Sequence, residues 1–126
     1  MRTVIVAFLA SSLAVPQAAL RGVFDGDWVG MSASGDFRIS IADDSKAAVE
    51  VVFTIANTEV KTRVTSSKVT AADVEATYEF DLGGNRLQSA IKGHLDGSRL
   101  EGTYKTTATA SGTQVDEGTW KAMKRE

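Results

Sequence analysis

Residues 74–81 read VEATYEFD, and they decide the fold because apolar side chains alternate strictly with charged or hydroxyl side chains along them. A period of two places successive side chains on opposite faces of a β-strand. One face of this segment is then apolar and the other polar, as in an antiparallel sheet with one side on a core and one in water. The pattern predicts a strand and argues against a helix, whose period is 3.6.

The same alternation recurs outward in both directions from this segment. It is visible in residues 37–42, 49–55, 60–65, 86–92 and 99–105. Turn-forming residues separate these runs, for example Gly83-Gly84-Asn85 and Asp96-Gly97-Ser98, and they are typical of short hairpin loops. A first strand around Trp28 and a last one from Gln114 to Met123 bring the predicted number of strands to about eight.

The length of 126 residues suits a single domain, which we place at residues 20–126. The sequence contains no cysteine, so no disulfide can stabilise this domain. We therefore predict an all-β fold, an eight-stranded antiparallel up-and-down β-barrel, because closure removes the exposed edges of the sheet. A two-layer β-sandwich is the alternative. Val115 and Trp120 have opposite parities on the last strand, which predicts a bulge near Gly118.

Residues 1–19 have the composition of a secretory signal peptide. Arg2 precedes an uncharged apolar run over residues 4–15, and small residues follow it. The run is shorter than the roughly 20 apolar residues that a membrane-spanning helix needs. The mature domain is therefore predicted to be secreted or periplasmic, without a membrane span after cleavage. Because the chain has no cysteine, a lipoprotein anchor is also excluded for a bacterial protein.

Gly26-Asp27-Trp28 lies on the first predicted strand. A G-x-W string at this place in an eight-stranded antiparallel barrel resembles the calycin superfamily, which contains lipocalins, fatty-acid-binding proteins and avidins. The resemblance implies that Trp28 closes one barrel end and that a basic residue of the last strand covers its ring. Lys121, Lys124 and Arg125 are available for that role. The chain lacks the helix that lipocalins carry after the barrel, and we transfer no ligand-binding residue from the family.

The sequence offers little that indicates enzymatic chemistry. The net charge of −2 argues against a nucleic-acid-binding protein. With no cysteine and His94 as the single histidine, tetrahedral zinc sites and histidine-dependent triads lack parts. The pairs Asp25/Asp27 and Asp43/Asp44 could act in acid–base catalysis or bind calcium, although aspartates that cap turns give the same pattern. We predict no catalytic residue, no metal and no cofactor.

The inward face combines large aromatic residues with small ones such as Ala76, Ser89, Gly93 and Gly102. This mixture fits either a tightly interdigitated interior, which the short chain favours, or a cavity with an aromatic wall. We predict an exported, non-enzymatic barrel that binds a small apolar molecule. The alternative is a structural or protein-interaction module with a filled barrel, whose partner is another exported protein. The candidate ligand-binding residues are Trp28, Phe37, Phe53, Tyr78, Tyr104 and Trp120.

Overall fold

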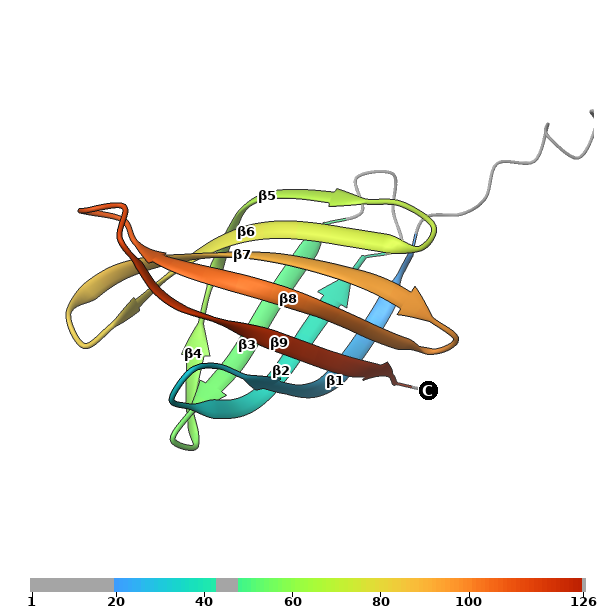
Figure 1. The fold of residues 1–126 in the computed structure, drawn as a ribbon. Coiled ribbons are helices and arrows are strands. Elements are labelled where there is room, and N and C mark those ends of the chain that lie inside the picture. The colour runs from blue at the N-terminus through green and yellow to red at the C-terminus, as the bar shows by residue number, and fades with distance from the viewer. Residues whose placement is uncertain (1–19, 43–47, 126) are drawn as a thin grey trace, which may run out of the picture.

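A computed structural model describes residues 20–42 and 48–125 of the chain, and Figure 1 shows these residues as an antiparallel sheet that curls into a barrel. The predicted signal peptide at residues 1–19 and the pair Asp43/Asp44 lie outside the described residues. The described part forms nine strands, which are β1 Gly22–Val29, β2 Ser34–Ile41, β3 Val49–Ile55, β4 Thr58–Lys61, β5 Arg63–Val69, β6 Asp73–Leu82, β7 Asn85–Asp96, β8 Arg99–Ala108 and β9 Gln114–Lys124.

The strands form one continuous sheet with the order β4-β3-β2-β1-β9-β8-β7-β6-β5. Every neighbouring pair is antiparallel, and neighbouring strands are consecutive in the sequence except for the pair β1 and β9. The two ends of this order, β4 and β5, are separated in sequence only by Thr62, whose Oγ1 donates a 2.6 Å hydrogen bond to the Val51 carbonyl oxygen on β3. The sheet is therefore nearly closed, which confirms an all-β, antiparallel, barrel-like fold.

The number of strands differs from the prediction because the run at residues 60–65 is divided in two. Up to Lys61 the chain pairs with β3, and from Arg63 onward it pairs with β6. One continuous extended segment thus changes partners at Thr62, so eight predicted strands become nine. A period of two does not reveal such a change of partner, because the inward and outward faces keep alternating through it.

The bulge in β9 lies at Val115 rather than near Gly118. Thr106 pairs with Asp116 and Thr107 pairs with Gln114, which leaves Val115 as the extra residue. Gly118 is needed for a different reason, because a Cβ atom there would lie 2.0 Å from the Val29 carbonyl oxygen. After the bulge, Asp116 shares the inward parity of Gly118 and Trp120, and this brings a carboxylate toward the barrel interior.

The two ends of the barrel are built differently. The turns of the hairpins β1–β2, β3–β4, β6–β7 and β8–β9 gather at one end, which we call the open end (Figure 1). At the other end, which we call the closed end, Phe24, Val74 and Leu100 are completely buried. Leu20 is also buried there, and its N–H donates a 2.8 Å hydrogen bond to the Thr70 carbonyl oxygen. The closed end is therefore sealed by aliphatic and phenyl side chains.

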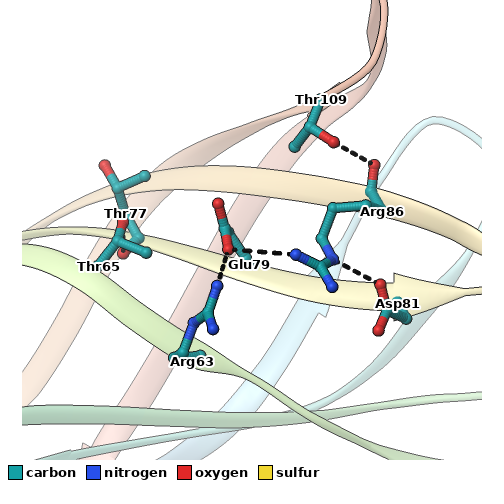
Figure 2. A network of polar contacts seen from close by, with 7 residues as sticks. All are labelled: Arg63, Thr65, Thr77, Glu79, Asp81, Arg86 and Thr109. Carbon is teal, nitrogen blue, oxygen red and sulfur yellow. Dashed lines mark hydrogen bonds and ion pairs between the residues drawn. The ribbon is translucent and has the colours of Figure 1, made fainter.

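Charged side chains on the outer face connect β5, β6 and β7, as Figure 2 shows. Glu79 on β6 forms ion pairs with Arg63 on β5 and with Arg86 on β7, and the guanidinium of Arg86 also contacts Asp81 at 2.6 Å. Individual ion pairs in water contribute little to stability. These side chains connect three strands close to the beginning of β5, and all of their charges lie on the solvent side of the sheet.

Candidate functional site: an aromatic cavity at the open end

A cavity of about 270 Å³ occupies the interior of the barrel at its open end. Its wall includes residues of the β1–β2 turn and of β1, β2, β3, β6, β7, β8 and β9. The structure brings all six predicted ligand-binding residues into this wall, namely Trp28, Phe37, Phe53, Tyr78, Tyr104 and Trp120. The barrel interior is thus hollow at the open end, whereas the short chain had favoured a filled interior throughout.

Among the described residues of the wall, six pairs of aromatic rings contact one another, three of them edge to face and three tilted. Phe53 lies at the centre of this cluster and meets both Trp28 and Phe80 nearly at right angles, with ring centroids 6.1 and 5.0 Å apart. Trp28 also meets Tyr104 at 86°, with centroids 6.0 Å apart. Edge-to-face contacts of this kind hold rings at fixed angles. The cavity wall is therefore built from rings that contact one another, and it is mainly apolar.

Glycines on neighbouring strands make room for the two indole rings. A Cβ atom at Gly93 would lie 2.5 Å from Cζ2 of Trp120, and one at Gly102 would lie 2.8 Å from Cε2 of the same ring. At Gly35, a Cβ atom would lie 2.8 Å from Nε1 of Trp28. A larger residue at Gly93 would collide first with the indole of Trp120, whereas at Gly35 and Gly102 it would also collide with the carbonyl oxygens of Thr54 and Lys92. The small residues on the inward face thus set the positions of the large ones.

The resemblance to calycins implied a basic residue over the ring of Trp28, but Arg125 has another partner. Its guanidinium contacts Asp25 at 2.7 Å, and Arg38 binds the other carboxylate oxygen of Asp25 at the same distance. The hydrogen bond from Arg38 lowers the pKa of Asp25, burial opposes it to a lesser extent, and Arg125 lowers the pKa further. Trp28 is held by its aromatic neighbours and by a 2.9 Å hydrogen bond from Nε1 to the Thr54 carbonyl oxygen.

Polar groups in the wall are paired within the protein. Ser89 and Thr106 share a buried hydrogen bond of 2.6 Å between their hydroxyls. Burial raises the pKa of Tyr78, while a hydrogen bond with Ser89 lowers it to a lesser extent. Among the described residues, no buried side-chain nitrogen or oxygen lacks a hydrogen-bond partner. Each buried polar side-chain atom of the wall therefore has at least one partner within the protein.

At the mouth, the Tyr104 hydroxyl donates a 2.7 Å hydrogen bond to Oδ2 of Asp116. Burial raises the pKa of Tyr104, and the hydrogen bond and negative charge of Asp116 raise it further. The backbone N–H of Met31 donates to the other carboxylate oxygen of Asp116 at 3.0 Å, which fixes the β1–β2 turn over this corner. Gly30 lies directly against the pair, since a Cβ atom there would be 2.3 Å from the Tyr104 hydroxyl.

The other residues considered for chemistry lie on the outer face. His94 is exposed, and its Nδ1 is 2.7 Å from an Asp73 carboxylate oxygen across the β6–β7 pair. Within residues 20–42 and 48–125, no three His, Cys, Asp or Glu side chains are grouped so that they could hold a metal ion. The same residues contain no helix long and apolar enough to cross a membrane.

A larger depression of about 460 Å³ lies on the outer face across β5 to β8. Its lining includes Lys68, Glu75 and Lys92, which belong to the polar side of the sheet. A strand surface of this composition is typical of a solvated face. The smaller cavity at the open end is the better candidate for a binding site, because it lies inside the barrel and its wall is mainly apolar.

Several wall residues are missing from the set of predicted ligand-binding residues. Phe80 and Ile91 continue the inward parity of Tyr78 and Ser89, so the alternation already placed them inside. Thr106 likewise follows the parity of Tyr104. Asp116 is the most informative of them. Asp116 has the same parity as Trp120, which places it on the inward face. It was not predicted there because it is charged and because the position of the bulge was not known.

Comparison with known proteins leaves this site to be interpreted from its own geometry. No protein-family model matches the sequence, and no curated protein and no solved structure is significantly similar to the chain.

Proposed function

We propose that this chain is an exported, non-enzymatic β-barrel protein that binds a small apolar molecule in the cavity at its open end. The observation that carries the proposal is the cavity itself, which has a largely aromatic wall whose buried polar atoms each have a partner within the protein. Water gains few hydrogen bonds in such a space, whereas an apolar molecule removes its own surface from water there.

The volume limits the size of the ligand. An apolar protein cavity of about 150 Å³ is large enough to take up benzene. Pockets for drug-sized ligands are generally about 300–1,000 Å³. At about 270 Å³, the cavity lies between these cases. A molecule with two fused rings, or a short branched chain of similar volume, is the expected class of ligand.

Export and the calycin-like character of the barrel are parts of the same proposal. The signal-peptide pattern at residues 1–19 supports export. The nearly closed antiparallel barrel, with Trp28 buried on its first strand, is compatible with the resemblance to lipocalins and avidins. Barrels of this size hold either packed side chains or one small ligand.

A second candidate function, contact with another exported protein, is favoured by apolar side chains around the mouth. Met31 is 71% exposed and Val115 is 49% exposed. Leu82, which is also exposed, lines the cavity entrance with Val115. Such side chains can serve a protein partner as well as a ligand that passes them. Cross-linking in the native envelope, at a photoreactive residue replacing Met31, would report such a partner.

The binding proposal is tested with naphthylmethanol, a neutral molecule with two fused rings, added to the full protein and followed by calorimetry. We expect one binding site per chain. Leu87→Trp places a bulky ring in the cavity wall and should abolish binding. The matched control is Leu95→Trp on the same strand, because Leu95 has the same inward parity and partial burial but lies toward the closed end, outside the wall.

Native mass spectrometry of the protein from its own source complements this titration. An additional mass in the range of a molecule with two fused rings, lost in Leu87→Trp and kept in Leu95→Trp, would support the proposal and reveal the ligand's mass. If naphthylmethanol binds neither to the wild type nor to the Leu95→Trp protein, the cavity is not a binding site for apolar molecules.

A further inference from the structure

Asp116 is the single charged residue among the described residues that line the cavity. The rest of the wall consists of aromatic, aliphatic and small hydroxyl side chains. Asp116 is partly buried, and its position on β9 aims the carboxylate inward beside Tyr104. A carboxylate at the mouth of an otherwise uncharged cavity gives that mouth a negative charge, and it therefore selects among ligands by their charge.

The carboxylate is fixed in place without being neutralised. It accepts hydrogen bonds from the Tyr104 hydroxyl and from the backbone N–H of Met31, one on each oxygen. In the part of the chain that the structure describes, no cationic side chain forms an ion pair with Asp116. A carboxylate has about four acceptor positions. Two are used, so the remaining ones are available to a donor on a ligand.

We propose that the cavity selects an apolar molecule that carries a cationic head group, such as a primary amine, with the ring body inside the barrel and the charge at Asp116. This inference rests on the proposed function and specifies its ligand class. An ammonium group would complete the acceptor positions of Asp116 through charge-assisted hydrogen bonds. The aromatic faces of the wall also carry negative potential, which favours a cation over an anion.

The same arrangement disfavours fatty acids and other apolar anions. Their carboxylate would lie at the mouth beside Asp116, and like charges at close distance repel. The Tyr104 hydroxyl is already committed to Asp116, and its raised pKa keeps it protonated and donating at neutral pH. No arginine or lysine lines the described wall to compensate an anion.

Three probes with the same ring system separate these possibilities: naphthylmethylamine, naphthylmethanol and naphthoate. Calorimetric titration of the full protein at neutral pH and low salt should give the order amine, alcohol, acid, from tightest to weakest. We expect the amine to bind about tenfold more tightly than the acid, since one charge-assisted contact at a partly exposed site is involved.

Asp116→Asn is the test variant, because it removes the charge while keeping the shape of the side chain. It should weaken binding of the amine and strengthen binding of the acid, so the ratio of these two affinities in each protein measures the effect of the charge. Glu117→Gln is the matched control. It removes the same charge one residue away on β9, where the side chain is exposed and absent from the cavity wall. The order of the three probes should persist in this variant.

The outcomes distinguish this inference from the proposed function on which it rests. If the alcohol binds but the amine binds no more tightly than the acid, selection by charge is refuted and the apolar binding site remains supported. The same conclusion follows if Asp116→Asn still binds the amine more tightly than the acid, to the same extent as the wild type. If the three probes all fail to bind the wild type, both proposals are refuted. An amine preference that disappears in Asp116→Asn and remains in Glu117→Gln supports both.

Discussion

The closed end and the open end of this barrel share one backbone pattern but differ in the side chains that fill it. Along β3, Val49 and Val51 point inward at the closed end, and Phe53 follows at the open end. Along β6, Val74 and Ala76 are followed by Tyr78 and Phe80. Aliphatic side chains interdigitate to the density of a crystal. Rings held edge to face keep fixed angles, and here they leave a space between them.

The difference shows that a small barrel can have a tightly packed core at one end and a cavity at the other. The closed end supplies stability through complete burial of residues such as Phe24 and Leu100. The open end carries a cavity whose wall is built from aromatic rings that contact one another.

Trp28→Ala and Phe24→Ala should each reduce the free energy of unfolding by about 3–5 kcal/mol, because each removes a large buried ring. The two variants should differ in binding. Trp28 lines the cavity and Phe24 does not, so only Trp28→Ala should change the affinity for naphthylmethanol. Urea denaturation and calorimetry measure the two effects. A loss below about 1 kcal/mol for Trp28→Ala would mean that its ring is not part of the core.

Gly93→Ala should cost about 1–3 kcal/mol, because its new methyl group would collide with the ring of Trp120. The displaced indole should narrow the cavity, so ligand affinity falls together with stability. Ala90→Val on the outer face of the same strand is the control, and its effect should stay within about 0.5 kcal/mol. Equal effects of the two substitutions in a denaturant melt would contradict the packing of Trp120 against β7.

Ser89→Ala should cost about 1–2 kcal/mol, because it removes the partner of two buried hydroxyls, those of Thr106 and Tyr78. Replacing both residues, with Ser89→Ala and Thr106→Val together, should recover only the part of that loss that is due to Thr106, since the Tyr78 hydroxyl still lacks Ser89. The double variant also makes the cavity wall more apolar, so it should bind naphthylmethanol more tightly than the wild type. If the double variant has a lower free energy of unfolding than Ser89→Ala, the Thr106 hydroxyl stabilises the barrel through more than its hydrogen bond with Ser89.

Asp25→Asn should have the smallest effect, below about 1 kcal/mol at neutral pH, because the ion pairs of Asp25 with Arg38 and Arg125 are exposed to solvent. The pKa of Asp25 is lowered in the folded protein. Its contribution is therefore complete above the ordinary carboxyl pKa and is lost as the pH falls through the lowered value. The difference in unfolding free energy between wild type and variant should shrink below about pH 4. A difference that grows on acidification would exclude this pairing.

Much of the fold could be predicted because side-chain alternation reports directly on a sheet with one buried face. The inward positions of Phe37, Tyr78 and Tyr104 follow from that alternation and need no knowledge of which strands are neighbours. The division at Thr62 could not be predicted in the same way, because it depends on which partner each half of the strand selects.

The cavity was harder to predict than the residues that surround it. Packing of the interior depends on the angles at which rings meet and on glycines such as Gly93 on β7 and Gly102 on β8, which make room for the ring of Trp120 on β9. Side-chain alternation does not report contacts of this kind, because they depend on the register of three neighbouring strands. The orientation of Asp116 was concealed for a related reason, because the position of the bulge at Val115 is fixed by pairing with β8.

The pairing of β1 with β9 has a consequence for the order in which the molecule folds. Asp25 and Arg125, which form an ion pair across this region, are 100 residues apart in sequence. Contacts between such distant segments slow folding, because the intervening chain must first be ordered. While the chain is being synthesised, β1 can pair with β2 on one side, but its other edge stays unpaired until the ribosome has released β9, residues 114–124. A chain truncated before Gln114 would leave β1 and β8 as open edges, which are templates for aggregation.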